Sequence, residues 1–298
     1  MILNIVKKVL LFIAVVSITG FLYEQYSRST TYIQPVGELV DIGGYNLHYL
    51  KKGSGDTTVV FESGSDIGGH LPWFKVQNEV AKFATTISYD RAGLMWSQRG
   101  DKPRTGDAMA QELHLMLENS GAKKPYVLVG HSLAGLILRS FVNKYPDDVK
   151  SIILVDPSHP KQNMEYNNTT SQIPLWLVDY ANSIGLFRLF VNQDYDSTLH
   201  NDEVNVVLRK MMYKGFNASM DEMNNFDNIA LDADKLKSFG DIPVTIISAN
   251  IDDDIWIRLH DELANMSTNS KHIKVKDAGH YIQLEKPKVV IDAIKERL

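Results

Sequence analysis

Short apolar runs alternate along most of the chain with longer segments in which apolar residues recur every three or four positions. The short runs are typical of strands covered on both faces of a sheet, and the longer spacing is typical of helices that pack along one side. Strands are predicted at residues 39–42, 46–50, 57–61, 85–89, 126–129, 151–155, 244–248 and 272–275, and helices at 73–83, 107–120, 133–145, 255–266 and 287–298. This alternation predicts an α/β fold, a mostly parallel sheet flanked by helices.

One segment interrupts the alternation between the sixth and seventh predicted strands. Residues 157–240 form an insert of roughly eighty residues without a convincing buried strand. Its amphipathic patterns are helical and cover residues 176–190, 202–213 and 221–231. We therefore expect a helical cap at 157–240, inserted into a core made of residues 37–156 and 241–298.

The N-terminus carries a targeting pattern. Lys7 and Lys8 precede an uncharged, mostly apolar run of 15 residues at positions 9–23, and polar residues follow it. Such a run fits a signal peptide or a short membrane span within residues 1–28. Because small residues suited to cleavage are poorly placed after the run, an uncleaved signal anchor is favoured. With the lysines inside, the rest of the chain is predicted outside the cytoplasm, anchored to the membrane or, alternatively, secreted.

The overall composition is that of an ordinary globular protein. The 298 residues are 44% hydrophobic and 22% charged, with a net charge of -5, which excludes a disordered chain and disfavours nucleic acid as a partner. There are no cysteines, so disulfides, thiolate metal sites and a catalytic thiol are excluded. No H-E-x-x-H motif, phosphate-binding loop or G-x-G-x-x-G motif follows the first buried strand, and no metal or cofactor is expected. The oligomeric state is left open.

The strongest local motif is YVLVGHSLAG at residues 126–135, a buried strand that runs into a turn of small residues and then into an apolar helix. In a nucleophile elbow a serine sits on such a turn, and small residues two positions before and after it let strand and helix approach closely. Gly130 meets the first requirement, and Ala134 stands where the second glycine is usual. The pattern predicts Ser132 as a nucleophile at the N-terminus of a helix, whose dipole favours developing negative charge.

From about Glu38 onward the chain resembles the α/β-hydrolase superfamily, in particular its esterase and proline-iminopeptidase-like branch. Five blocks carry the resemblance in the family's order: VVFESGS at 59–65, ISYDRAGLMWS at 87–97, PYVLVGHSLAGL at 125–136, ILVDPSHP at 153–160 and DAGHYIQLEKP at 277–287. The resemblance implies a catalytic triad in the chain order serine, acid, histidine.

The base and the acid are expected late in the chain. His280 lies in a glycine-bearing loop after the last predicted strand and matches the family's histidine, so it is the predicted base. The acid usually follows the strand after the cap, and the resemblance in spacing favours Asp252 there. Asp254 is an alternative acid, although it could instead cap the next helix, a role expected for at least one of the three carboxylates at 252–254. Asp156 is the other alternative, because some members of the superfamily place the acid at the end of the preceding strand.

The oxyanion hole is predicted from two backbone N–H groups. One belongs to Leu133, which follows the nucleophile, and the other to Ser65, in the loop after the strand at 57–61. Asp90 and Arg91 are expected to form a structural loop pair.

The sequence thus predicts a serine hydrolase that cleaves a carboxylic ester or a small amide through an acyl-enzyme on Ser132. One alternative is an aminopeptidase like the proline iminopeptidases, which needs cap carboxylates to bind a free amine. The candidates for that role are Asp194, Asp196, Glu203, Asp221, Glu222 and Asp227. A non-catalytic ligand-binding protein on the same fold is the alternative from another class.

Overall fold

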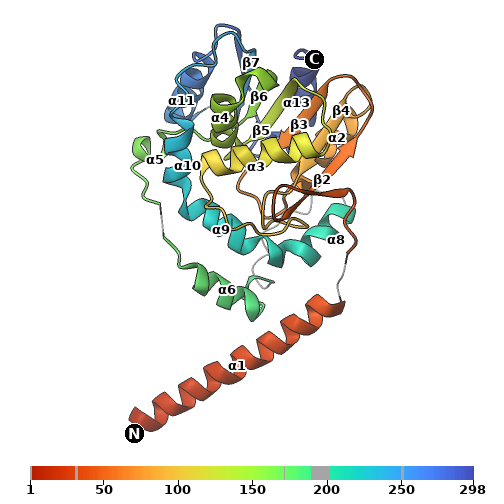
Figure 1. Cartoon of the computed structure of the whole chain (residues 1–298). Coiled ribbons are helices and arrows are strands. Elements are labelled where there is room, and N and C mark those ends of the chain that lie inside the picture. The colour runs from red at the N-terminus through yellow and green to blue at the C-terminus, as the bar shows by residue number, and fades with distance from the viewer. Residues whose placement is uncertain (1, 31–32, 171, 189–201, 250–251) are drawn as a thin grey trace.

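An eight-stranded sheet crosses the body of the protein in the computed structural model, which describes all residues except 1, 31–32, 171, 189–201 and 250–251 (Figure 1). The strands are β1 (Glu38–Asp41), β2 (Asn46–Lys52), β3 (Thr58–Glu62), β4 (Thr85–Tyr89), β5 (Tyr126–His131), β6 (Val149–Val155), β7 (Val244–Ser248) and β8 (Ser270–Lys274). Their order in the sheet is β1-β2-β4-β3-β5-β6-β7-β8. β2 is antiparallel to both of its neighbours, and the pairs from β4 to β8 are parallel. All eight strands were predicted, and the mostly parallel α/β fold is confirmed.

The helices of the core follow the strands in alternation. They are η1 (Leu71–Trp73), α2 (Phe74–Val80), α3 (Gly106–Asn119), α4 (Ala134–Lys144), η2 (Pro146–Asp148), α11 (Asp254–Ala264), α12 (Ile282–Glu285) and α13 (Pro287–Lys295). α3 begins where the Thr105 hydroxyl accepts a hydrogen bond from the Ala108 N–H, the usual way to satisfy a free amide at a helix start. The helix predicted at 73–83 is shorter than expected and begins as a 3₁₀ turn with Pro72 in its first positions.

Alternate side chains of the central strands enter two different layers. Val60 and Leu128 pack with apolar residues of α3, α4 and α11 on one face, whereas Val59 and Phe61 pack with those of α2 and α13 on the other. Every residue of β3, β5 and β7 is buried, as expected of parallel strands covered by helices on both faces (Figure 1). The two layers hold the carboxyl ends of β5 and β6 side by side, which is where the candidate site lies.

Helices between β6 and β7 form the cap. They are α5 (Gln162–Glu165), α6 (Leu175–Ser183), α8 (Asp202–Met211), η3 (Met212–Lys214), α9 (Phe216–Asn224) and α10 (Phe226–Ala233). The helix predicted at 221–231 is divided into α9 and α10 at Asn225, whose side-chain amide donates to the Asp221 carbonyl and competes with helix continuation. Phe226 and Ile229 of α10 pack against Leu133 and Ile137 at the start of α4, so the cap is fixed to the helix that follows Ser132.

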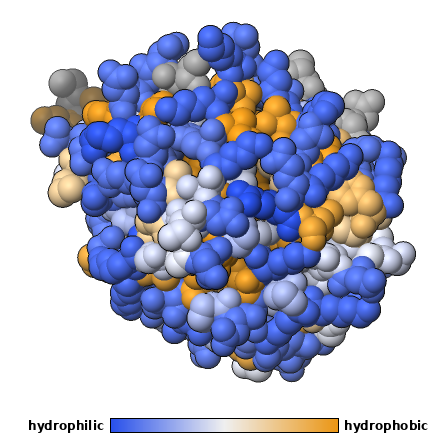
Figure 2. All heavy atoms as spheres, turned by 90° about the horizontal axis from the view of Figure 1, so that it is seen from above, coloured by the Kyte–Doolittle hydropathy of each residue, from blue (hydrophilic) through white to orange (hydrophobic). Residues whose placement is uncertain are grey.

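The N-terminal helix α1 (Ile2–Thr30) extends beside α6 and away from the rest of the body (Figure 1). It is long and apolar enough to cross a membrane, a property that signal sequences share, and almost all of its apolar side chains are exposed. Figure 2 shows the face of the body turned away from α1, where hydrophilic residues surround smaller apolar areas. The exposed apolar surface of α1 therefore contrasts with this face of the body.

Candidate active site

Ser132 occupies a strained turn between β5 and α4. Its φ of +54° lies in the left-handed region, which a residue with a side chain adopts only when the surroundings hold it there. A Cβ added at Gly130 would lie 2.6 Å from Leu138 Cδ1 and 2.9 Å from Ala134 Cβ. Glycine is therefore required at position 130, and Ala134 fits in place of the motif's second glycine. This is the strand–turn–helix geometry predicted for a nucleophile elbow.

His280 is held by Asp156, which lies at the end of β6. Its Nδ1 is 2.6 Å from Asp156 Oδ2, and the other carboxylate oxygen accepts hydrogen bonds from the Ala249 N–H at 2.9 Å and the Trp256 indole N–H at 2.8 Å. Asp156 is fully buried and also has a left-handed backbone, with a φ of +45°. Three donors therefore fix this carboxylate beneath the ring of His280.

The charge of Asp156 determines which nitrogen of His280 carries a proton. Burial raises the pKa of Asp156, but the hydrogen bonds from His280 and Trp256 outweigh burial and leave the pKa below its ordinary value. The carboxyl group is thus ionised at neutral pH and can only accept hydrogen bonds. His280 must donate from Nδ1, which leaves Nε2 of the neutral ring as an acceptor.

His131 connects the elbow to the His280 loop. Its Nε2 lies 2.9 Å from the His280 carbonyl oxygen, and the two imidazole rings are 4.6 Å apart. Burial lowers the pKa of His131 to about 3, so the ring is neutral and donates its Nε2 proton to that carbonyl. The residue next to Ser132 is thereby bonded to the backbone of the predicted base.

The preferred acid, Asp252, needs correction. Its side chain is exposed, and the carboxylate that contacts His280 belongs to Asp156, the alternative from the preceding strand. Asp253 caps α11 by accepting the Trp256 N–H at 3.0 Å, whereas Asp254 is exposed in the first turn of that helix. The capping carboxylate at the start of α11 is therefore Asp253, one residue before Asp254.

A family model described as the alpha/beta hydrolase fold matches residues 61–287 of the chain. The chain belongs to this family. The match covers both the Ser132 turn and the His280 loop, so the predicted superfamily is confirmed.

Individual α/β hydrolases are distant from this chain in sequence but cover most of it. Proline iminopeptidase PfmaB of Pestalotiopsis fici is 24% identical over 88% of this chain and 99% of its own length. The esterase of Thermogutta terrifontis superposes with a TM-score of 0.64 at 21% identity, covering 85% of this chain and 92% of its own. The epoxide hydrolase of Bacillus megaterium superposes with a TM-score of 0.68 at 20% identity, over 87% and 99%. Together with the family match, these similarities support a hydrolase enzyme.

The loop after β3 runs directly against the elbow of this α/β hydrolase. A Cβ added at Gly64 would lie 2.9 Å from Ser132 Cβ and 3.0 Å from His131 Nδ1. Glycine allows the backbone of this loop to approach the serine closely, which a loop that supplies an oxyanion-hole N–H group must do. The N–H groups of Ser65 and Leu133 flank this contact in the sequence, and their role stays a prediction.

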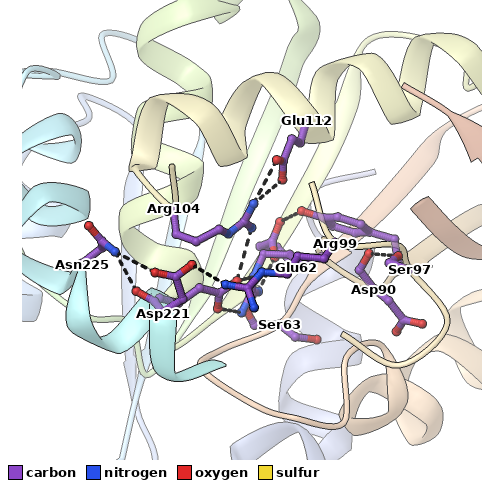
Figure 3. Close-up of polar contacts among 12 residues, drawn as sticks. Glu62, Ser63, Asp90, Ser97, Arg99, Arg104, Glu112, Asp221 and Asn225 are labelled. Carbon is purple, nitrogen blue, oxygen red and sulfur yellow. Dashed lines mark hydrogen bonds and ion pairs between the residues drawn. The ribbon is translucent and has the colours of Figure 1, made fainter. Parts of the chain in front are cut away.

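A buried ion cluster that the sequence does not reveal holds this loop in place. Arg91 donates to the carbonyl oxygens of Ser63 and Gly64, both at 2.6 Å, and to the carboxylates of Glu62 and Glu222, both at 2.7 Å. In the same cluster (Figure 3), Arg104 pairs with Glu112 at 2.8 Å and with Glu222 at 3.3 Å. Since Glu222 belongs to α9, the cluster joins the cap to the backbone beside Ser132.

Asp90 and Arg91 make structural contacts but do not pair with each other; Asp90 pairs with His48 Nδ1 and His70 Nδ1, both at 2.8 Å. The potential metal-ligand atoms of these three buried residues lie within 4.8 Å of one another, a spacing that could hold a metal ion. However, His48 Nε2 also lies 3.0 Å from the Val36 carbonyl oxygen, so both of its nitrogens face acceptors. Burial lowers the pKa of His48, but the hydrogen bond to Asp90 outweighs it and raises the pKa above its ordinary value. Hydrogen bonds from a protonated His48 to Asp90 and to the Val36 carbonyl thus explain why these residues lie so close together.

Proposed function

We propose that this α/β hydrolase is a serine hydrolase that cleaves a carboxylic ester, or a small amide, through an acyl-enzyme on Ser132. In the proposed triad His280 is the general base and Asp156 the acid. The observation that carries the proposal is the 2.6 Å hydrogen bond from His280 Nδ1 to buried Asp156, beside a serine on a left-handed turn. A nucleophile, a base and a group that orients the base are the three parts that such catalysis requires.

In the proposed first step, Ser132 Oγ attacks the substrate carbonyl carbon while His280 Nε2 takes the hydroxyl proton. The resulting imidazolium is stabilised by ionised Asp156, and the oxyanion by the N–H groups of Leu133 and Ser65. Collapse of this intermediate expels the alcohol or amine, which receives the proton from His280. A water molecule, deprotonated by the same nitrogen, then releases the acid and restores Ser132. No group outside the chain and water is required.

The positions of the cap carboxylates favour an ester over an amine-bearing peptide. Glu222 is neutralised by Arg91 and Arg104, Asp227 accepts hydrogen bonds from Asn163 and Thr170, and Asp221 pairs with Arg99 at 3.3 Å. Carboxylates already engaged in this way are poor ligands for a substrate α-amine. Glu203 is exposed, and Asp194 and Asp196 lie outside the described residues.

We further propose that α1 is an uncleaved signal anchor that leaves the catalytic body outside the cytoplasm. The basic pair Lys7 and Lys8 at its start and the apolar run after it support this orientation. Sodium carbonate extraction of membranes tests the anchor: the protein is expected to stay in the membrane pellet, and its release into the supernatant would contradict the proposal.

The proposed nucleophile is tested by labelling with a fluorophosphonate probe. Wild type is expected to be labelled, and Ser132→Ala to be unlabelled while it keeps the wild-type circular dichroism spectrum. Ser270→Ala, which alters an exposed serine on β8, is the matched control and should be labelled fully. Absence of label on folded wild type would favour the ligand-binding alternative. Comparing an ester with an N-terminal prolyl amide then separates an esterase from an aminopeptidase.

A further inference from the structure

The second half of α1 packs closely against the cap helix α6. The Ser17 hydroxyl lies 2.5 Å from the Tyr180 hydroxyl, and a Cβ added at Gly20 would lie 2.6 Å from the Ile184 carbonyl oxygen. Ser17 and Gly20 are three residues apart, so they lie on one face of α1. The two helices are therefore in direct contact rather than merely neighbours in Figure 1.

Farther along the same face of α1, ion pairs lock the two segments together. Glu24 is fully buried and pairs with Arg28 at 2.7 Å and with Arg188, just after α6, at 2.5 Å. Arg28 also donates to the Asn182 carbonyl oxygen at 3.0 Å and lies over the ring of Tyr213, 4.4 Å from its centre. A buried carboxylate shared by two arginines resists separation, so α1 and α6 form one unit.

The level of α6 relative to a membrane follows from this contact. Ser17 and Gly20 belong to the uncharged run at 9–23, and Glu24 is the first charged residue after it. At a rise of about 1.5 Å per residue, Ser17 lies about 10 Å deeper along the helix than Glu24. If the run lies in hydrocarbon, Glu24 and its arginines lie among the headgroups, and Ile184, which contacts Gly20, lies just below the boundary between headgroups and acyl chains. The Tyr180 hydroxyl then reaches below that boundary, to the level of Ser17.

The exposed face of α6 suits that boundary. Trp176 is 70% exposed, Leu177 and Tyr180 of the same helix are exposed as well, and so is Leu186 after the end of the helix. Tryptophan and tyrosine are enriched where lipid meets water. A groove of about 490 Å³, lined by residues that include Val16, Tyr23, Ile184 and Leu186, continues this apolar surface onto α1.

We propose that α6 lies in the interfacial layer of the bilayer into which α1 is inserted, so that the cap rests on the membrane. The occupant of this surface is lipid, because the surface is continuous with an apolar helix that itself needs lipid and ends at the ion pairs of Glu24 with Arg28 and Arg188. The inference rests on the proposed anchor. It places a substrate dissolved in the membrane nearer to the cap than a substrate in bulk water.

Trp176 provides the test, since the other three tryptophans are buried or partly buried. The full chain is reconstituted into phosphatidylcholine vesicles that carry bromine on the acyl chains, either close to the headgroup or close to the chain end. Bromine near the headgroup is expected to quench tryptophan emission, and Trp176→Phe should remove most of that loss. Trp96→Phe, the matched control, should retain it.

Two outcomes would overturn the inference, and they are distinct from failure of the anchor. One is a Trp176 emission that bromine does not quench, in vesicles from which carbonate fails to extract the protein. The other is a disulfide between two copies of Trp176→Cys, which would assign the surface to a second copy; the chain has no other cysteine to confuse this result. Release of the protein by carbonate would instead contradict the anchor itself.

Discussion

Two aspartate–histidine clusters lie within the same body and differ in what surrounds the histidine. Asp156 holds His280 at 2.6 Å, and Asp90 holds His48 and His70 at 2.8 Å. The His280 side chain is 39% exposed, whereas that of His48 is fully buried and its second nitrogen meets the Val36 carbonyl. A hydrogen bond to a carboxylate therefore does not by itself mark a catalytic histidine. The two clusters differ in exposure: His280, the proposed base, is partly exposed, whereas both histidines of the Asp90 cluster are buried.

The largest expected effect is a loss of activity, and it distinguishes Asp156 from Asp90. Asp156→Asn should lower kcat for ester hydrolysis by about 10⁴, because the amide favours the wrong tautomer of His280. The melting temperature should change little, since the amide oxygen can still accept the hydrogen bonds from Ala249 and Trp256. Steady-state kinetics on a chromogenic ester measures this. Activity within tenfold of wild type would mean that Asp156 is not the acid.

The same substitution in the other cluster should affect stability instead. Asp90→Asn removes the counter-charge of a buried, protonated His48, and loss of one partner of a buried pair costs about 3–5 kcal/mol in unfolding free energy. Urea unfolding followed by circular dichroism measures the loss. The folded fraction should keep near-normal kcat. A variant that lost activity at full stability would give Asp90 a role in the chemistry.

A third group of histidines predicts acid sensitivity. Burial lowers the pKa of His131 to about 3 and those of His159 and His260 to about 4. The unfolded chain binds these protons near pH 6.5, before the folded protein does, so stability should fall as the pH drops from about 6.5 to 4. Each histidine contributes up to about 1.4 kcal/mol per pH unit in that interval. His48 acts in the opposite direction, because its raised pKa contributes stability that is present at low pH and lost as the pH rises through the folded value.

Urea midpoints between pH 4 and 7 check this slope, and His260→Gln should reduce it. A midpoint independent of pH across that interval would contradict the expected neutral state of these rings.

The smallest effect is expected for Asp252→Asn. The side chain is exposed, and substitutions at such positions usually change stability by less than about 0.5 kcal/mol. Both kcat and the urea midpoint should stay close to wild type. An inactive Asp252→Asn alongside an active Asp156→Asn would reverse the assignment of the acid.

The sequence was most informative where a local pattern determines the geometry. Residues 85–89 and 244–248 are strands with the predicted bounds, because an apolar run of that length has few alternatives in an α/β chain. The turn at Ser132 was predictable for the same reason: only small residues at positions 130 and 134 allow strand and helix to approach.

The acid was not decided by the same kind of pattern. Both Asp156 and Asp252 follow a buried strand, and the sequence shows neither the left-handed backbone at Asp156 nor the direction of the Trp256 indole. The ion pair of Arg91 with Glu222 was equally hidden, since its members are 131 positions apart and meet only through the packing of the cap. Convergence of distant side chains is a property of the packed fold and leaves little local trace.

The ion cluster beneath α9 limits how this enzyme can admit a substrate. An outward movement of α9 would draw Glu222 away from Arg91 and Arg104, and each buried guanidinium would keep only its second carboxylate partner, Glu62 or Glu112. Breaking such buried ion pairs costs several kcal/mol. The same movement would disturb the carbonyl groups of Ser63 and Gly64, which Arg91 also holds. This part of the cap is therefore fixed in place, and substrate and product must enter and leave by a route that does not require α9 to move.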